Sequence, residues 1–357
     1  MAGGDEAAAL PPWLEAPLER ALRSARGHAL LIHGPRGVGQ WELGLAIAHA
    51  WLCEAQPADR MAHRAACGHC TGCRLIAAGT HPDLRVVVPP AWRETLGLAD
   101  DDAQADDDAG KSKAKPSKDI KVEAARSIVE FAQQTASRGR GKVVLLFPAE
   151  RMNPTSANML LKTLEEPAGA TRFLLATAQA QRLLPTVRSR CQPVALGMPK
   201  VEQAATWLAA RGIEKPEWLL AAAGGSPIEA LQRWQRSGID AKTWQALPAE
   251  VLAQRTATLA AWPLPLAVDA LQKLCHDLLC VAAGAAPRYF DRSALPAGGE
   301  VQRLGACARE LANAARHAEH PWHAPLAVEA LVQRVADAAR GPRATRTAAS
   351  PMTTLAR

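Results

Sequence analysis

The sequence has few aromatic residues: Phe, Trp and Tyr make up 4% of its 357 residues, and Ala and Leu dominate instead, which favours helix. It contains no run approaching the roughly 18 apolar residues that a membrane-spanning helix needs. Its first residues, Met1–Glu6, are acidic and lack the basic start and apolar stretch of a signal peptide. We therefore expect a cytoplasmic protein without membrane contact, in which disulfides are rare and clustered cysteines indicate metal.

The length predicts two or three domains, and a hydrophobic content of 48% is enough to build a core in each. The net charge of +7 permits contact with nucleic acid but is equally typical of an ordinary basic protein. The charges are unevenly distributed, with an Asp-rich run followed by a Lys-rich run inside residues 89–118. That composition cannot bury much surface and predicts a disordered insertion, while residues 341–357 predict a basic, disordered tail.

Short apolar runs alternate with helical patterns in the first part of the chain. Five runs predict strands, at residues 29–33, 84–88, 143–147, 173–177 and 192–196, and the continuous apolar run at 143–147 predicts a strand buried on both faces. Helical patterns lie between them at residues 40–52, 122–137 and 153–167. This alternation predicts a parallel sheet with flanking helices. The predicted domains are an α/β domain over 1–198, a small helical domain over 199–245 and a helical domain over 246–340.

The loop after the first predicted strand has the glycines of a nucleotide-binding P-loop but not its chemistry. The pattern is G-x-x-x-x-G-K-[ST], and Gly34 and Gly39 match it. Gln40 stands where a lysine would hold the β- and γ-phosphates of ATP. Trp41 stands where a hydroxyl would bind Mg²⁺. We expect neither bound ATP nor hydrolysis, although the glycine turn leaves weak phosphate binding open.

The second half of such a site is also missing. The strand at 143–147 should end in an Asp for Mg²⁺ and a Glu that orients the attacking water. Phe147 and Pro148 occupy those positions. Glu150 lies two positions further on, too far in register to be taken as a substitute.

Two downstream motifs are more specific. Residues 158–167 read Asn-Met-Leu-Leu-Lys-Thr-Leu-Glu-Glu-Pro, and residues 189–191 read Ser-Arg-Cys. They resemble the A-L-L-K-x-L-E-E-P and S-R-C motifs of bacterial clamp-loader subunits, a branch of the AAA+ proteins, and the resemblance extends over residues 28 to about 240. Ile228 replaces the arginine of a segment similar to the sensor 2 motif G-S-x-R-[DE]-A-L. An S-R-C motif beside three broken nucleotide motifs is similar to the delta-prime type.

The resemblance implies an AAA+ α/β domain followed by a helical lid domain and an all-α collar domain that mediates oligomerisation. It implies a replisome component of the DNA polymerase III holoenzyme, without ATPase activity of its own, that helps to load the sliding clamp onto primed DNA. The implied partners are gamma/tau and delta subunits in a hetero-oligomeric ring. Through this complex the chain would also act on the sliding clamp and on primed DNA.

The same resemblance implies a role for Arg190 as an arginine finger, acting in trans on ATP bound to a neighbouring gamma/tau subunit. A guanidinium suits this role because it is always charged and offers a planar fork of donors. Arg188 is the alternative, although a surface arginine explains it as well. We expect Ser189 to shape the turn and Cys191 to pack in the core.

The cysteines suggest a metal site. Cys67, Cys70 and Cys73 form C-x₂-C-x₂-C, and Cys53 lies upstream. Four thiolates suit tetrahedral Zn²⁺, and a complete set of four protein ligands indicates a structural site. His63 or His69 could ligate in place of Cys53, and a redox C-x-x-C or an iron–sulfur cluster are the other possibilities. The remaining cysteines of the helical region are predicted to lie in the core: Cys275, Cys280 and Cys307.

Two other functions compete with a non-hydrolysing clamp-loader subunit. The chain could be an ATPase that uses a degenerate site, in which case the isolated chain would turn over nucleotide. It could instead be a zinc module that binds DNA through the basic residues Arg138, Arg140 and Lys142. Salt-dependent DNA binding by the chain alone would favour that second alternative.

Overall fold

The computed structural model describes residues 10–55, 64–98, 116–296, 299–318 and 323–340. They form two compact units. The first contains the chain as far as Gly212 together with Ser226–Glu229, and the second contains Ile213–Gly225 and the chain from Ala230 onward. Most of the predicted insertion (99–115) and the basic tail (341–357) lie outside the described residues, and the division into three domains stays a prediction.

The first unit is built on a five-stranded parallel sheet with the strand order β2-β3-β4-β1-β5. Its strands are β1 (Ala29–His33), β2 (Leu84–Val87), β3 (Lys142–Leu146), β4 (Thr171–Thr177) and β5 (Gln192–Ala195). β1 lies between β4 and β5, with Leu31 opposite Leu175 and Pro193. Each of the five predicted strands is present, which confirms the predicted α/β architecture with a parallel sheet and flanking helices.

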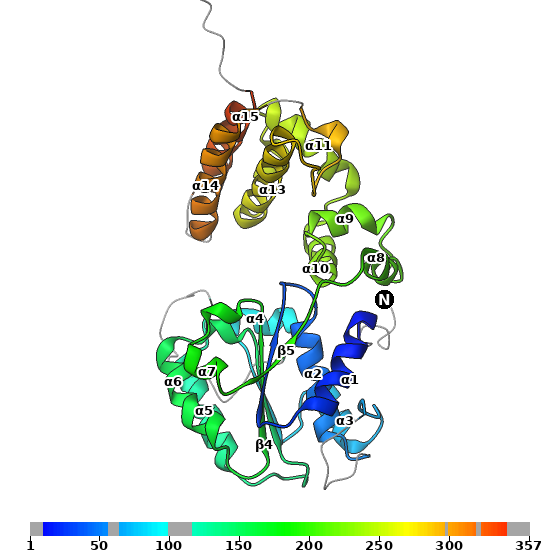
Figure 1. Cartoon of the computed structure of the whole chain (residues 1–357), viewed down its shortest axis with the longest axis vertical. Coiled ribbons are helices and arrows are strands. Elements are labelled where there is room, and N and C mark those ends of the chain that lie inside the picture. Colours follow the sequence, from blue (N-terminus) through cyan, green and yellow to red (C-terminus); the bar gives the residue numbers. More distant parts are fainter. Residues whose placement is uncertain (1–9, 56–63, 99–115, 297–298, 319–322, 341–357) are drawn as a thin grey trace, which may run out of the picture. The chain divides into compact units, whose positions relative to one another are not determined.

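Alternate residues of the strands pack into separate cores on the two faces of the sheet, as the pleat requires. Leu30, Ile32 and Leu145 belong to one core, and Leu31 and Phe173 belong to the other. Helices α1, α2 and α3 lie on one side of the sheet and α5, α6 and α7 on the other (Figure 1). The bounds are α1 (Glu15–Ser24), α2 (Gln40–Leu52), α3 (Thr71–Ala77), α5 (Val122–Gln133), α6 (Pro154–Glu165), α7 (Pro185–Arg188) and α8 (Val201–Ala209).

One local prediction needs correction. Residues 89–118 were expected to be solvated and without structure, but α4 (Pro90–Arg93) and a 3-10 turn (Glu94–Leu96) form at their start. The reason is a tertiary contact, since the ring of Trp92 packs edge-on against Phe147 with centroids 5.6 Å apart. A start at Pro90 also suits a helix, because proline fits the first helical turn.

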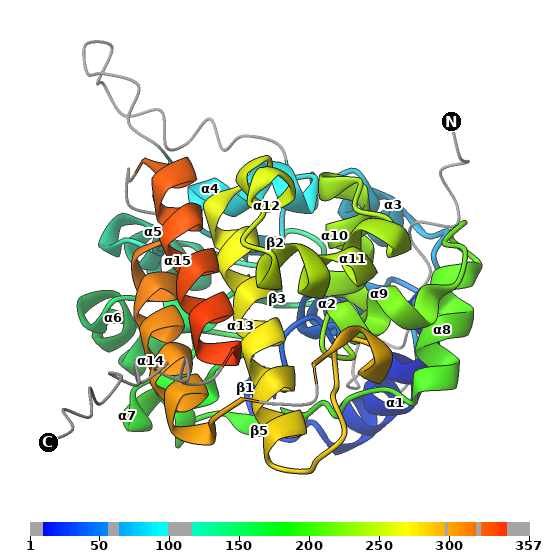
Figure 2. The same cartoon turned by 90° about the horizontal axis from the view of Figure 1, so that it is seen from above.

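The second unit is helical, as predicted. Its helices are α9 (Pro216–Ala222), α11 (Ala241–Leu252), α12 (Ala257–Ala260), α13 (Leu264–Ala282), α14 (Val301–His317) and α15 (Ala324–Ala339), and α10 (Pro227–Ser237) begins in the first unit. Figure 2 shows α13, α14 and α15 side by side. Cys275 and Cys307 are buried as predicted, whereas Cys280 is only partly buried, which corrects its assignment to the core.

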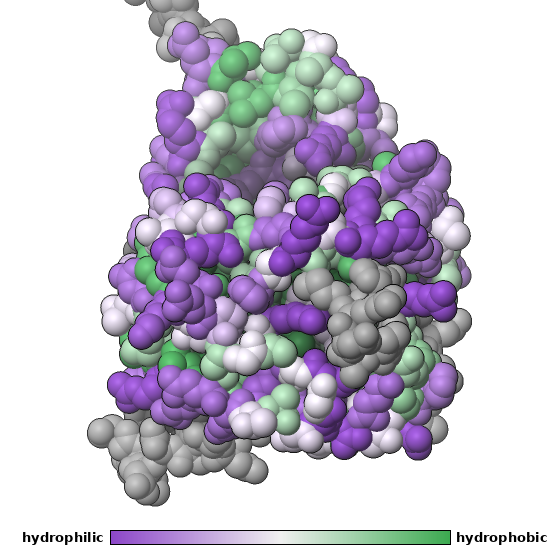
Figure 3. Space-filling view, turned by 60° about the horizontal axis from the view of Figure 1, so that its bottom comes forward, coloured by the Kyte–Doolittle hydropathy of each residue, from purple (hydrophilic) through white to green (hydrophobic). Residues whose placement is uncertain are grey.

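Within the described residues, no helix combines the length and apolarity needed to cross a bilayer. Hydrophilic residues predominate over the lower part of the face drawn in Figure 3. This agrees with a charged content of 22% and with apolar strand residues that point into the two cores.

Candidate functional site

Gln40 lies inside the P-loop and binds the backbone of that loop. It is the first residue of α2 and is 4% exposed. Its side-chain Nε2 donates to the carbonyl oxygens of Gly34 (2.9 Å) and Pro35 (2.6 Å). A lysine at this position reaches the phosphates in an intact P-loop. Here the amide turns back onto the loop and joins its two ends.

The next three carbonyl oxygens of the loop are bound as well. Their donors are Ser226 Oγ to Arg36 (2.6 Å), the Ile228 N–H to Gly37 (3.2 Å) and the Trp13 indole N–H to Val38 (2.8 Å). Every carbonyl from position 34 to 38 therefore accepts a hydrogen bond from the protein itself. Ile228, at the position of the sensor 2 arginine, contributes only its backbone N–H to this arrangement.

The loop is also closely packed. Gly39 has a φ of 111°, and a Cβ atom on it would lie 2.5 Å from Leu14 Cδ1. Only glycine fits such a position, because the positive φ and the contact both exclude a side chain. The N-terminal segment that carries Trp13 and Leu14 thus packs directly against the P-loop.

Aromatic rings occupy both positions at which Mg²⁺ would be bound. The ring of Trp41, at the hydroxyl position of the P-loop, lies 5.7 Å from that of Phe147, at the acid position after β3. The ring of Trp92 also packs against that of Phe147, with centroids 5.6 Å apart. Rings at these separations attract one another and offer no oxygen ligand to a hard cation.

Glu150 does not replace the missing acid. It lies in a 3-10 turn (Ala149–Arg151) after β3. Its carboxylate accepts hydrogen bonds from the Thr177 hydroxyl (2.6 Å) and from the Ala178 N–H (3.3 Å) at the end of β4. This carboxylate is therefore committed to fixing the turn between β3 and α6.

Arg190 connects the two motifs that carried the family resemblance. It lies between α7 and β5, and its Nε and Nη2 donate to Glu165 Oε2 at 3.2 and 2.9 Å. Its Nη1 donates to the carbonyl of Thr186 at 3.0 Å. Glu165 is the last residue of α6, within the Leu-Glu-Glu-Pro motif. The side chains of Arg190 and Glu165 are 30% and 58% exposed, so this is a surface ion pair.

The neighbours of Arg190 shape the turn. Ser189 Oγ donates to the carbonyl of Thr186 at 3.1 Å, and Arg188 is exposed at the end of α7. Cys191 is buried in the core on the α5–α7 face of the sheet, and this burial raises the pKa of its thiol to about 12. Cys191 therefore packs in the core, as predicted.

The four predicted cysteine ligands lie together. The Sγ atoms of Cys53, Cys67, Cys70 and Cys73 are all within 4.8 Å of one another. Cys53 Sγ is 3.9 Å from Cys70 Sγ, and Cys67 Sγ is 4.0 Å from Cys73 Sγ. Four thiolates on a tetrahedral ion with bonds of about 2.3 Å would lie about 3.8 Å apart. The donor set and its spacing therefore fit a metal ion.

Backbone groups also favour thiolates in this cluster. The N–H groups of Cys67, Cys70 and Cys73 point at the sulfur atoms of Cys53, Cys67 and Cys70, respectively, at 3.3–3.4 Å. Burial raises the pKa of the Cys70 thiol, but hydrogen bonds from these backbone groups and neighbouring thiols outweigh it, and the pKa falls to about 6. Burial raises the pKa of the Cys73 thiol.

Of the two histidines considered as ligands, His69 is exposed, and its Nδ1 lies 2.8 Å from the carbonyl of Cys67. His63 lies outside the described residues. Cys53 directly follows α2, the helix that starts at the P-loop. A Cβ atom on Gly72 would lie 2.8 Å from the Leu52 carbonyl, so the cysteine segment packs tightly against the end of α2.

The basic residues proposed for DNA contact are mostly engaged within the protein. Lys142 is 3% exposed, and its Nζ donates to the Phe131 carbonyl at 3.0 Å. Arg138 forms an ion pair with Glu54, next to Cys53, and this hydrogen bond lowers the pKa of the Glu54 carboxyl. Arg140 is half-buried. This arrangement gives little support to a DNA-binding zinc module.

Sequence reasoning missed three contributors to the site: Trp13, Trp92 and Glu165. The two tryptophans could not be found, because each acts through a contact with a residue distant in the sequence. Glu165 could have been found, because it belongs to the Leu-Glu-Glu-Pro motif that carried the family resemblance. The structure pairs it with Arg190 of the S-R-C segment.

Several known proteins are similar to this chain over most of its length. The family model described as DNA polymerase III, delta subunit, matches residues 14–200. A Pseudomonas aeruginosa protein named DNA polymerase III subunit delta' is 38% identical over 271 residues, 72% of this chain and 74% of that protein. The Escherichia coli subunit delta' is 34% identical over 283 residues, 73% and 76% of the two chains. The Escherichia coli subunit tau is 33% identical over 180 residues, 49% of this chain and 22% of tau. The chain belongs to the family of DNA polymerase III delta-prime subunits.

Proposed function

We propose that this chain is a non-hydrolysing subunit of a cytoplasmic clamp loader, which loads the sliding clamp onto primed DNA together with gamma/tau and delta subunits. In this proposal Arg190 acts as an arginine finger on ATP bound by a neighbouring gamma/tau subunit. The relatives named delta' and tau support a clamp-loader role. The observation that carries the finer proposal is the contrast between a P-loop filled by its own side chains and a partly exposed arginine whose single carboxylate partner lies on the surface.

The filled P-loop supports the absence of ATP chemistry in this chain. The hydroxyl and carboxylate that would bind Mg²⁺ are replaced by Trp41 and Phe147, whose rings are in contact. The lysine is replaced by Gln40, whose amide nitrogen donates to two loop carbonyls. An ATP phosphate would have to displace these contacts without gaining a metal ion or a lysine charge in return.

The setting of Arg190 supports a role in trans. Its guanidinium is held mainly by Glu165, in a surface ion pair. Such pairs contribute about 0–1 kcal/mol, so a phosphate from another subunit can replace Glu165 at little cost. A guanidinium that exchanges a carboxylate for phosphate oxygens keeps its charge-assisted hydrogen bonds throughout. Glu165 would then hold the arginine in place until the neighbour's nucleotide arrives.

The cysteine cluster supports a structural zinc ion held by Cys53, Cys67, Cys70 and Cys73. Zinc prefers four thiolates in tetrahedral array, and a closed set of four leaves no position for a substrate. The ion would join the end of α2 to the start of α3, because Cys53 follows the first helix and Cys73 lies in the second. Its contribution would be to folding, not to the chemistry of ATP.

The test of the first proposal is ATP turnover in a reconstituted loader with clamp and primed DNA. We expect Arg190→Ala to lower ATP turnover by at least about tenfold. The upper bound is the loss of about 10³–10⁵ that removal of an arginine finger causes in GTPases. Arg188→Ala, on the same turn, is the matched control and should leave turnover unchanged. Normal turnover and assembly with Arg190→Ala would leave a purely architectural subunit.

The zinc proposal is tested by metal analysis and unfolding. The purified chain should contain zinc, and Cys73→Ser or a strong chelator should remove one equivalent and lower the unfolding midpoint, because structural zinc contributes directly to folding. His69→Gln is the control and should keep that equivalent. A full zinc content in Cys73→Ser would show that this cluster is not the site.

A further inference from the structure

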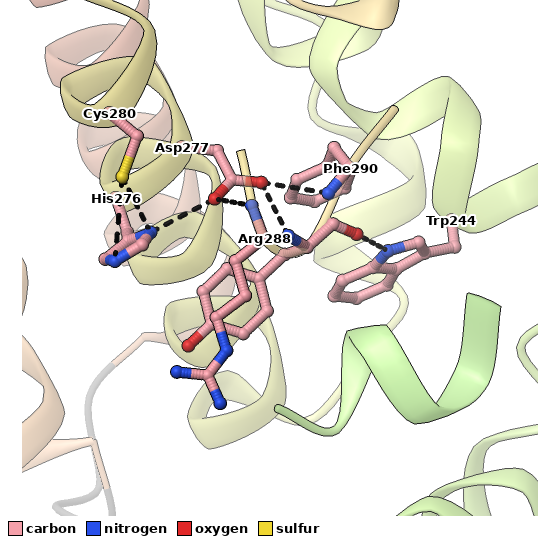
Figure 4. Close-up of polar contacts among 7 residues, drawn as sticks. Trp244, His276, Asp277, Cys280, Arg288 and Phe290 are labelled. Carbon is pink, nitrogen blue, oxygen red and sulfur yellow. Dashed lines mark hydrogen bonds and ion pairs between the residues drawn. The ribbon is translucent and has the colours of Figure 1, made fainter. Parts of the chain in front are cut away.

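Two aspartates among the described residues, Asp83 and Asp277, are 0% exposed. A buried carboxylate is stable only when hydrogen bonds compensate its lost hydration. Asp277, on α13, accepts such bonds from three successive backbone N–H groups, those of Arg288 (2.8 Å), Tyr289 (2.7 Å) and Phe290 (2.9 Å) (Figure 4). It thereby fixes the segment that follows α13.

Asp83 has the same kind of contacts in the first unit. Its carboxylate accepts the N–H groups of Ser137 (2.7 Å) and Arg138 (2.8 Å), which lie between α5 and β3. Its backbone carbonyl accepts the Val143 N–H (2.9 Å), where the pairing of β2 with β3 begins. Its own N–H donates to Nδ1 of the buried His81 (3.1 Å). Asp83 therefore fixes the backbone that carries Arg138 against the amino end of these strands.

The Arg138 side chain connects this fixed backbone to the cysteine cluster. Its Nε donates to Glu54 Oε1, in an ion pair whose side chains are 30% and 27% exposed. The hydrogen bond to Glu54 raises the pKa of Arg138 against the effect of burial, and the charges of Glu54, Asp83 and Cys70 act in the same direction. Four thiolates carry more negative charge than one Zn²⁺ ion neutralises, so a guanidinium beside them stabilises the loaded cluster.

Glu54 contacts the cysteine cluster at two points. It directly follows Cys53, and a Cβ atom on Gly72 would lie 3.4 Å from its Oε1. The hydrogen bonds from Arg138 and from the Gly72 N–H lower the pKa of the Glu54 carboxyl against the effect of burial. Burial raises the pKa of the Cys70 thiol, and the N–H groups of Cys73 and Glu54 are among the contacts that lower it. Glu54 thus joins the first ligand of the cluster to the turn that carries the last two.

We propose that Glu54 and Arg138 position the ligands of the zinc cluster and that Asp83 positions Arg138, so that metal binding and the order of residues 134–141 are coupled. This relay of three residues rests on the zinc ion proposed above. A bound ion fixes Glu54 beside its ligands, and Glu54 then holds Arg138. The coupling is reciprocal, because a segment that stabilises the bound state is itself stabilised by the ion. The ion therefore stabilises the β2–β3 edge of the sheet as well as the cysteine turn.

The first test is the Zn²⁺ affinity of the full chain, measured by competition with a chromophoric chelator. Arg138→Ala and Glu54→Ala should each weaken binding by about 10–100-fold, the usual loss when a partner of the metal ligands is removed. Because the two side chains act as a pair, the double variant should lose no more affinity than Glu54→Ala alone. Arg126→Ala, at an exposed position on α5, is the control and should keep the wild-type affinity.

The two buried carboxylates provide a second, matched comparison. Asp83→Asn should weaken Zn²⁺ binding at least about tenfold, because the backbone that carries Arg138 is released. Asp277→Asn should leave the affinity unchanged, although it also loses a buried charge that accepts backbone N–H groups. Circular dichroism checks that both variants are folded. An equal loss of affinity in both would mean that zinc binding follows global stability, and the relay would be wrong.

Hydrogen exchange of the wild-type chain tests the coupling without a substitution. Removal of zinc by a chelator should accelerate exchange of the Ser137 and Arg138 N–H groups at least about tenfold, while those of Tyr289 and Phe290 on the other buried carboxylate stay unchanged. Unchanged exchange at Ser137 and Arg138, or wild-type affinity in Arg138→Ala, would overturn the relay and leave the zinc proposal standing. A wild-type chain that takes up no zinc would overturn both.

Discussion

The P-loop at 34–41 and the turn that carries Arg190 lie at opposite ends of the parallel strands of the same sheet. The loop follows the carboxyl end of β1, and the turn precedes the amino end of the adjacent parallel strand β5. Both carry residues of clamp-loader motifs. In the loop, the protein's own groups bind five successive carbonyls and fill the metal position with rings. In the turn, the Arg190 side chain stays partly exposed and is held mainly by one exposed carboxylate.

The difference follows from how many groups each role needs. An ATP site requires a lysine, a hydroxyl, an acid and a sensor arginine at once, so the loss of some removes the reason to keep the rest. The vacated space is then best filled by packing and internal hydrogen bonds, because unfilled space and unpaired polar groups destabilise a protein. A finger needs one guanidinium within reach of another subunit. A chain can therefore lose the pocket and keep the finger.

The largest effect should come from restoring an acid to the filled pocket. Phe147→Asp would place a carboxylate between the rings of Trp41 and Trp92. Without a lysine or metal to compensate it, we expect a loss of about 3 kcal/mol in the free energy of unfolding, measured by urea denaturation. Phe147→Leu, which stays apolar, should lose less than about 1.5 kcal/mol. Mg²⁺-dependent ATP binding by Phe147→Asp would break the comparison, because the pocket would then be open.

A smaller effect is expected at Gln40. Gln40→Ala removes the donor to the Gly34 and Pro35 carbonyls. Leaving buried acceptors without a partner costs about 1–3 kcal/mol in total, so the unfolding midpoint should fall without a change in the slope of the transition. Gln133→Ala, at an exposed position on α5, is the matched control and should stay within about 0.5 kcal/mol. An unchanged midpoint for Gln40→Ala would mean that its two hydrogen bonds do not stabilise the loop.

The sequence was sufficient for the sheet because each strand is a short run of mostly apolar residues. The three inner strands, β1, β3 and β4, are buried almost throughout, and the two outer strands, β2 and β5, are partly buried. Even the start of α6 was predictable, since Asn153 accepts a hydrogen bond from the Ser156 N–H at 2.7 Å, as an N-cap should. The identity of the lost P-loop groups was equally readable, because the motif fixes each position. What fills the pocket was not readable. The contacts of Trp13 and Trp92 join segments distant in the sequence, and no local pattern specifies them.

Two predictions were wrong for different physical reasons. Residues 90–96 were assigned to an unstructured insertion by composition, but Trp92 anchors them to Phe147. Cys280 was assigned to the core by the apolar character of its helix. It lies on the partly exposed face that α13 shares with His276, and periodicity alone did not separate this face from the one that carries Cys275. Tertiary contacts decided the first case, and the orientation of the helix decided the second.

The smallest effect should come from Glu165, and it tests the other half of the comparison. Because exposed ion pairs contribute about 0–1 kcal/mol, Glu165→Ala should change the free energy of unfolding by less than about 1 kcal/mol. Glu166→Ala, the next residue and also exposed, is the control. In the reconstituted loader, Glu165→Ala should reduce ATP turnover far less than Arg190→Ala, because the guanidinium is kept and only its resting contact is lost. A loss of several kcal/mol in Glu165→Ala would instead identify the Arg190–Glu165 pair as part of the fold, and Arg190 could not then leave it for a neighbour's phosphate at little cost.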